Sequence, residues 1–256
     1  MNPVSRFFYE IQEMSLLVWR VLVGVKRGPR YPNEVIAQMD EIGVGSLIII
    51  ILTGFFTGGV LVLQVYPTLA SYGAQTQAGQ AVATTLVREL GPVLCALMVA
   101  GRVGSAISAE LGSMLVSQQI DAMRALGTSP IRKLVTPRIV ALVICLPLLT
   151  VAADTFGLMG GGIVGKQLYG LDSNIYIASA RNGIDIDDIL GGVIKPLVFG
   201  FIIGVVSCYR GLNTSGGTAG VGKSTTSAVV TASICVIIAD FFLSKILQTL
   251  FKTSIF

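Results

Sequence analysis

Gly217, Gly222, Lys223 and Ser224 spell the phosphate-binding pattern G-x-x-x-x-G-K-S near the end of the chain. In nucleotide-binding enzymes, the backbone amides of such a loop cradle phosphates. That chemistry requires a strand before the loop and an acidic strand beyond it for magnesium, whereas membrane-length apolar stretches lie on both sides here. We therefore interpret the segment as a turn, with Ser224 or Thr225 capping the next helix, and keep a membrane NTPase using the 217–224 loop as an alternative.

A second set of candidate residues combines charge with apolar surroundings. A charge in hydrocarbon is costly, so it usually faces a cavity or a charged partner. The residues concerned are Arg88, Glu89, Arg102, Asp154, Lys195 and Asp240. Gly91 and Pro92 directly follow Arg88 and Glu89, and we expect them to bend or break the helix and expose backbone groups to a cavity. For Asp154, Lys195 and Asp240, a cavity and an intramembrane layer of salt bridges both remain open.

A third candidate is a polar segment between two apolar stretches. Residues 117–127 predict a short amphipathic helix that ends in a glycine cap at Gly127, followed by Pro130 and Pro137. A helix placed between two membrane spans is typical of a docking element, which we assign to 113–127. Its candidate contact residues are Gln118, Gln119, Asp121, Met123 and Arg124.

The elements that position these residues are membrane helices. No Asp, Glu, Lys or Arg occurs from Ile42 to Val87, and crossing about 30 Å of hydrocarbon takes roughly 20 apolar residues. We predict an all-α integral membrane protein, a single domain over 1–256, with transmembrane helices at 42–66, 83–110, 139–165, 189–209 and 226–248.

The loops between these spans indicate one orientation. The 111–138 loop contains Arg124, Arg132, Lys133 and Arg138 with one acid, so the positive-inside rule makes it cytoplasmic. Lys26, Arg27 and Arg30 fall on the same side, as do Arg210 and Lys223. The acidic 166–188 loop falls outside. We predict a cytoplasmic N-terminus and a periplasmic C-terminus, with Arg88, Glu89, Asp154, Lys195 and Asp240 in the outer half of the membrane.

The first 30 residues have a different pattern. Apolar residues recur at helical spacing and charges line the other side, which predicts an interfacial amphipathic helix over 1–30. The apolar set is Phe7, Ile11, Met14, Val18, Val21 and Val25, and the polar set is Arg6, Glu10, Glu13 and Arg20. A soluble helix packed on a partner is the alternative. Gly28, Pro29, Pro32 and Asn33 are expected to break this helix, and a polar stretch to Glu41 leads into the membrane.

Composition excludes several classes of function. A net charge of +4 is too small to indicate nucleic-acid binding, and the absence of histidine, with Cys95, Cys145, Cys208 and Cys235 all in apolar stretches, supports neither a metal site nor a disulfide framework. Small residues set the expected packing: Gly54 and Gly58 form a G-x-x-x-G pair. Such a face serves packing within the bundle or self-association.

Two resemblances add to this picture. Asp121 and Ala122, with Gly127 six residues after the acid, resemble the coupling-helix motif of ABC importer permeases, although the family's Glu-Ala-Ala is Asp-Ala-Met here. Nearly the whole chain resembles the MlaE/YrbE permeases of MCE-type ABC phospholipid transporters. The segments that carry this resemblance are Arg88–Val93, Ala100–Ser105, Ala109–Gly112, Gln119–Met123 and Gly220–Thr226.

The second resemblance implies a homodimer of five-span permeases in the bacterial inner membrane. Its implied partners are cytoplasmic ABC ATPases, which hold the ATP and magnesium, a periplasmic MCE hexamer and a small STAS-domain protein. This chain itself is then expected to carry no catalytic residue, metal or cofactor. The implied lipid site is an outward-facing dimer cavity, where Arg88, Glu89, Leu61 and Tyr72 match lipid-associated positions.

The expected function is therefore movement of phospholipid between the inner membrane and the MCE subunit, contributing to outer-membrane lipid asymmetry. Sterol or another apolar lipid is the alternative substrate, because apolar lipids of several classes suit such a cavity. A passive channel or scaffold is a further alternative that needs neither a coupling helix nor an ATPase. The direction of transport leaves no trace in the sequence.

Overall fold

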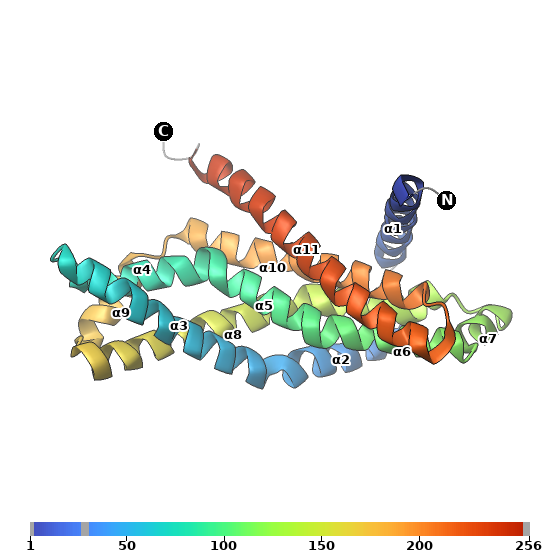
Figure 1. Ribbon diagram of the computed structural model, residues 1–256, viewed down its shortest axis with the longest axis horizontal. Coiled ribbons are helices and arrows are strands. Elements are labelled where there is room, and N and C mark those ends of the chain that lie inside the picture. Colours follow the sequence, from blue (N-terminus) through green and yellow to red (C-terminus); the bar gives the residue numbers. More distant parts are fainter. Residues whose placement is uncertain (1–2, 27–30, 253–256) are drawn as a thin grey trace. The chain divides into compact units, whose positions relative to one another are not determined.

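The computed structural model describes residues 3–26 and 31–252, and every regular element in these two ranges is a helix (Figure 1). Five helical stretches are long and apolar enough to cross a membrane. They are Pro32–Ser71, Gln75–Val116, Ile131–Tyr169, Ile186–Leu212 and Gly217–Leu250. The predicted all-α class and its five spans are confirmed, and each helix extends beyond the span predicted from hydropathy. Arg27, Arg30, Gly28 and Pro29 lie outside the described residues.

The chain divides into two compact units, each built from segments distant in sequence. The first unit comprises Met1–Ile42, Val99–Cys145 and Phe199–Val236, and the second comprises Gly43–Met98, Leu146–Val198 and Ile237–Phe256.

Several long helices contain a π-helical turn, in which one extra residue widens the helix. The first transmembrane stretch consists of α2 (Pro32–Met39), the π-turn η1 (Asp40–Val44) and α3 (Gly45–Ser71). The N-terminal helix does not continue through this region: Tyr31 is not helical, and Pro32 begins α2 in its first turn, where its missing N–H has no partner to lose. The polar stretch to Glu41 is therefore helical.

The second stretch combines α4 (Ala78–Thr85), the π-turn η3 (Leu86–Leu90), α5 (Gly91–Val99), the π-turn η4 (Ala100–Gly104) and α6 (Ser105–Val116). A short 3₁₀ turn, η2 (Gln75–Gln77), precedes α4. The third stretch begins with the π-turn η5 (Ile131–Val135) and continues as α8 (Thr136–Tyr169). The expected break at Gly91 and Pro92 is thus a π-turn followed by continued helix.

In the first unit, α1 (Pro3–Lys26) packs on η5. Leu17 and Val21 are buried, whereas Trp19 is 68% exposed, so the described part of α1 buries one side. The side chains of Phe7, Ile11, Val25, Arg6 and Glu10 lie outside the described set, and membrane contact by α1 remains a prediction.

Close backbone approach holds the rest of the first unit together. Gly200 and Gly204 of α10 (Ile186–Leu212) face Leu142 and Ile139 of α8 so closely that a methyl group at either glycine would meet backbone atoms. Arg138, 3% exposed, pairs with Glu110 at 2.6 Å between Nη2 and Oε1.

The last helix, α11 (Gly217–Lys252), starts at the glycine-rich segment. Ser224 and Thr225 therefore lie inside a helix, and their expected role as N-caps is wrong. The Ser224 hydroxyl donates to the carbonyl of Arg210 at 2.6 Å and lies 3.1 Å from the Ser108 hydroxyl. These contacts tie the start of α11 to α10 and α6.

In the second unit, α3 and α8 approach through glycine. A Cβ atom at Gly54 or Gly58 would collide with the backbone of Ala153 or Gly157, so the predicted G-x-x-x-G pair packs within this chain. Beside them, Val62, Ala78, Val82, Leu86, Leu171 and Tyr176 form a buried cluster.

A helix that the sequence analysis treated as loop completes this unit. Helix α9 (Ser173–Asn182) lies beside α4 (Figure 1). It starts at Asp172, whose Oδ1 accepts the backbone N–H of Asn174 at 2.8 Å. Two hydrogen bonds join α9 to α4: Gln80 N donates to Ser179 Oγ, and Thr84 Oγ1 donates to the Gly183 carbonyl, both at 3.0 Å.

Candidate substrate-binding site

Lys195 is the centre of a charged network in the second unit. Its side chain is 3% exposed, and its Nζ donates to Glu89 Oε2 at 2.6 Å and lies 3.2 Å from Asp240 Oδ1. Glu89 also accepts from the Ser244 hydroxyl at 3.1 Å. Three helical segments, η3, α10 and α11, thus contribute to one site, and each charge of the network has an opposite charge within reach.

The backbone next to Pro92 provides the third partner of Lys195. Proline has no N–H, so the carbonyl of Arg88, four residues earlier, loses its usual helical donor. Lys195 Nζ donates to this carbonyl at 2.7 Å. The buried ammonium of Lys195 therefore replaces the hydrogen-bond donor that the Arg88 carbonyl lacks because of Pro92.

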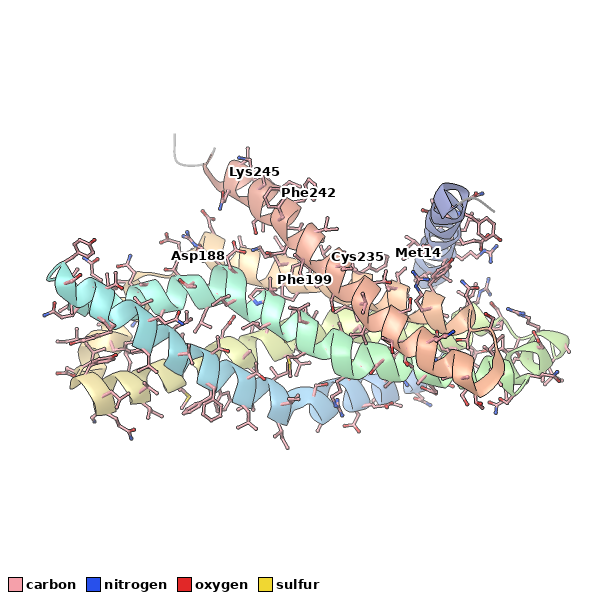
Figure 2. The ribbon with its side chains drawn as sticks, in the orientation of Figure 1. Met14, Asp188, Phe199, Cys235, Phe242 and Lys245 are labelled. Atoms are coloured by element: carbon pink, nitrogen blue, oxygen red, sulfur yellow. The ribbon has the colours of Figure 1, made fainter. Side chains whose placement is uncertain are left out.

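Arg88 lies beside this network and is paired differently. Its Nε donates to Asp188 Oδ1, and Asp188 Oδ2 accepts the backbone N–H of Asp185 at 3.1 Å. Asp188 is in the first turn of α10 (Figure 2), where a helix N-terminus favours a carboxylate. The Arg88 side chain is 50% exposed while that of Asp188 is 6% exposed. Because only Nε contacts Asp188, the other guanidinium N–H groups remain available to a ligand.

These residues enclose a cavity of about 280 Å³. Both cations, Arg88 and Lys195, line it with Glu89 and the acidic group at the start of α10. The remaining lining residues are Asp185, Asp187, Asp188, Gly191, Ser244, Leu247 and Gln248. The site can hold a charged headgroup beside Arg88, while Leu247 provides an apolar wall.

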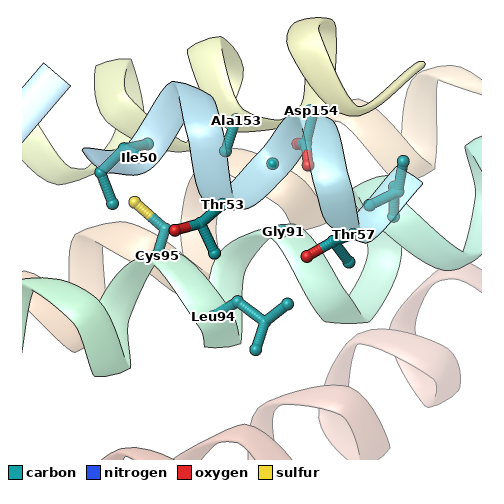
Figure 3. Close-up of a pocket in the computed structure, with 10 residues that line it drawn as sticks. Ile50, Thr53, Thr57, Gly91, Leu94, Cys95, Ala153 and Asp154 are labelled. Carbon is teal, nitrogen blue, oxygen red and sulfur yellow. The ribbon is translucent and has the colours of Figure 1, made fainter. Parts of the chain in front are cut away.

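Asp154 lies apart from this network, although the sequence analysis grouped it with Lys195 and Asp240. It lines a cavity of about 10 Å³ between α3, α5 and α8, with Thr53, Thr57, Gly91 and Cys95 (Figure 3). Asp154 is 9% exposed, and its Oδ1 has no hydrogen-bond partner within residues 3–26 and 31–252. The cavity has room for about one water molecule.

Comparison with known proteins identifies the architecture that carries this site. The family model for "Permease MlaE" matches residues 35–246. The chain belongs to the MlaE permease family. It is 39% identical to a "Probable ABC transporter permease protein" of Rickettsia felis over 94% of this chain and 93% of the relative.

Two further relatives show how widely the MlaE permease family extends. The "Intermembrane phospholipid transport system permease protein MlaE" of Haemophilus influenzae is 36% identical over 96% of this chain and 95% of its own. The chloroplastic protein TRIGALACTOSYLDIACYLGLYCEROL 1 of Arabidopsis thaliana is 38% identical over 94% of this chain and 69% of its own. Family membership and the five apolar helices make this chain a multi-pass inner-membrane permease of the ABC-transporter type.

The structure separates the four residues that the MlaE resemblance placed at a lipid site. Arg88 and Glu89 line the 280 Å³ cavity, whereas Leu61 and Tyr72 do not. Leu61 packs against the buried cluster around Val62, and Tyr72, at the end of α3, is 80% exposed. The residues missed from sequence are Asp188 and Ser244, whose partners are 100 and 155 positions away.

The predicted coupling segment of this MlaE permease forms a shorter helix than expected. Residues 113–116 belong to α6, and α7 spans Gln119–Ala125 after a left-handed residue at Gln118 (φ 58°). Gly127 adopts φ +73°, and Thr128 N donates to the Met123 carbonyl at 2.9 Å, so the predicted glycine cap has the Schellman geometry.

Most of the α7 surface is exposed. Asp121 and Arg124 pair at 2.9 Å and are 60% and 61% exposed, and Gln118 and Gln119 are also exposed, while Met123 is half-buried. Ile120 is fully buried and anchors the helix. A rigid, capped helix with a polar exposed face remains available for a partner.

Proposed function

We propose that this chain is the permease subunit of an ABC transporter that moves phospholipid between the inner membrane and a periplasmic MCE subunit, contributing to outer-membrane lipid asymmetry. The observation that carries the proposal is the cavity around Arg88. It places a half-exposed guanidinium beside an apolar wall, which suits a phosphodiester linked to acyl chains.

The charges of the cavity narrow the substrate class. Asp185 and Asp187 line it along with the paired acids, so a headgroup with more than one negative charge would be repelled. A sterol, the alternative substrate, has no anionic group for Arg88 to bind. The geometry thus favours a phospholipid with a single phosphodiester.

The partners of this permease follow from the same proposal. The exposed face of α7, with Asp121 and Arg124, is available to an ABC ATPase subunit that supplies ATP hydrolysis with magnesium. A second copy of the chain would complete the cavity and bring Leu61 and Tyr72 toward it. An MCE hexamer on the outer side and a small STAS-domain protein complete the proposed assembly.

The alternative of an NTPase on the 217–224 segment is disfavoured. In the described ranges the segment opens a helix that follows another helix, and the Ser224 hydroxyl is bound to the Arg210 carbonyl. Lys223→Ala should leave ATP turnover of the assembled complex nearly unchanged. Loss of nucleotide binding by this chain alone in that variant would instead support the NTPase.

Arg88→Glu tests the lipid site. It places a carboxylate opposite Asp188 and in the cavity, so lipid transfer by the reconstituted complex should be abolished while assembly is retained. Arg88→Ala should be milder, since it removes an attraction without adding a repulsion. Photocrosslinkers at positions 88, 61 and 72 should capture lipid. Capture only by crosslinkers on the bilayer-facing surface would show that Arg88 is structural.

Asp188→Asn separates the two roles of Arg88. It keeps the shape of the first turn of α10 but releases the guanidinium from its ion pair. If Arg88 binds phosphate, lipid capture by crosslinkers at positions 61 and 72, with Arg88 in place, should be retained or increased. A parallel loss of lipid capture and of thermal stability would indicate that the Arg88–Asp188 pair serves only to hold α10 against η3.

A further inference from the structure

A groove of about 620 Å³ lies between the second half of α8 and helix α9, both in the second unit. Its walls are apolar: Leu158, Met159 and Ile163 come from α8, and Tyr176, Ile177 and Ala180 from α9. Met159, Ile163 and Ile177 are 53%, 45% and 63% exposed, so the groove opens to the surroundings. Its volume is in the range of about 300–1,000 Å³ that small-molecule ligands occupy.

Two cations and Ser173 are the polar lining residues of this mostly apolar groove. Lys166 is in the last turn of α8, and Arg181 is in the last turn of α9. Both are exposed, and neither forms an ion pair within the described residues. Both side chains are therefore free to bind a negatively charged ligand in the groove.

The position along α8 indicates which ligand this is. Lys166 follows directly on the predicted span 139–165, and a rise of about 1.5 Å per residue places it roughly 18 Å along α8 from the buried Asp154. Long cationic side chains at the end of a membrane helix extend to the level of the lipid headgroups. The apolar walls below them then face the acyl chains.

We propose that the α8–α9 groove is a binding site for one anionic glycerophospholipid of the surrounding bilayer. Its phosphate is held by Lys166 and Arg181, and an acyl chain lies along Met159, Ile163 and Ile177. The site shares no lining residue with the Arg88 cavity, so it is separate from the proposed transport site.

Occupation of the groove has a structural consequence. Helix α9 contacts α4 through the Gln80–Ser179 and Thr84–Gly183 hydrogen bonds, and α4 leads directly into η3 with Arg88. A lipid that bridges α8 and α9 holds α9 in this position. The lipid of the groove therefore supports the wall of the unit from which Arg88 projects.

Native mass spectrometry of the purified full chain tests the proposal, with phosphatidylglycerol as the anionic probe and phosphatidylcholine as the zwitterionic one. The unmodified protein should retain phosphatidylglycerol in preference to phosphatidylcholine. A basic residue near an anionic headgroup contributes about 1 kcal/mol, or about fivefold in affinity, so Lys166→Gln with Arg181→Gln should lower retention by about 25-fold. Lys245→Gln, an exposed cation on α11 (Figure 2), is the matched control and should change nothing.

Two more variants define the site. Ile177→Trp fills the groove from an exposed position and leaves both cations in place, so it too should lose phosphatidylglycerol. In an Arg88→Gln background, which weakens the transport cavity, Lys166→Gln with Arg181→Gln should still lower retention of phosphatidylglycerol further, which separates this site from the transport cavity. Unchanged retention in the Lys166→Gln, Arg181→Gln double variant would overturn the proposal. So would full retention in Ile177→Trp, since the lipid would then contact the cations without entering the groove.

Discussion

Replacing Lys195 with Met is the most direct test of the charged network. The substitution keeps an unbranched apolar stem of nearly the same length, with sulfur in place of one methylene, and removes the ammonium. Three oxygen atoms then lose a partner: the Arg88 carbonyl at 2.7 Å, Glu89 Oε2 at 2.6 Å and Asp240 Oδ1 at 3.2 Å. The variant should therefore fold less stably, because buried anions without a partner are costly.

The size of the effect follows from the exposure of the partners. Removing one member of a buried pair costs about 3–5 kcal/mol, and the lower end applies because Glu89 and Asp240 are 43% and 20% exposed. For a chain of this length, 1 kcal/mol corresponds to about 2–4 °C in melting temperature, so a loss of about 3 kcal/mol lowers it by about 6–12 °C.

The cysteines provide the assay. Cys95, Cys145 and Cys208 are free and buried, while Cys235 is partly exposed, so a thiol-reactive fluorophore reports unfolding in detergent. Lys245→Met is the control for loss of a cation. Adding Glu89→Gln and Asp240→Asn to Lys195→Met should recover most of the stability. If Lys195→Met melts within 2 °C of the control, the network does not stabilise the fold and our reasoning fails.

Three other predictions follow from single contacts. Asp121→Lys should abolish capture of the partner ATPase in a pull-down. The permease should stay folded, because the Asp121–Arg124 pair is exposed and contributes little to stability. Undiminished capture of the ATPase by this variant would contradict docking on α7. Gly58→Leu should prevent folding because its side chain meets the Gly157 backbone, whereas Gly101→Ala, which meets nothing within 4 Å, should fold normally by size-exclusion chromatography. Burial raises the pKa of Tyr176 to about 12, so the stability that its neutral phenol contributes is complete below pH 10 and is lost as the pH rises from 10 to 12. Tyr176→Phe should remove this loss. If the melting temperatures of the unmodified protein and the variant depend on pH in the same way, Tyr176 does not cause the loss.

Hydrophobic length explains why the spans were predictable. A charge-free run has few alternatives to a membrane helix, so all five were identified, and the positions of Arg88, Glu89, Lys195 and Asp240 within them were correct. Which charges meet was not predictable in the same way. Arg88 and Asp188 are 100 positions apart, and their pairing depends on how η3 and α10 pack.

Local sequence was misleading where tertiary contacts decide the structure. The glycine-rich start of α11 has weak helix propensity, but Ser224 bonds to the Arg210 carbonyl and fixes the first turns. The four aspartates of the 166–188 segment predict a loop, whereas the structure contains helix α9 there. The signal that could have revealed it is Asp172, which precedes a helical spacing of Tyr176 and Ala180 and caps the helix through the Asn174 N–H.

Two features that the sequence presents separately form one structural unit at the candidate substrate-binding site. Pro92 was expected to disturb a helix, and Lys195 to be a costly charge. In the structure, Pro92 has no N–H to donate to the Arg88 carbonyl, and Lys195 Nζ donates to this carbonyl instead. Because this bond is to the backbone, Lys195 keeps one partner whatever contacts Glu89 makes with a ligand. A lysine held by the backbone stays beside the cavity when a ligand displaces one of its carboxylate partners, so the proposed site can bind and release a charged headgroup without losing its buried cation.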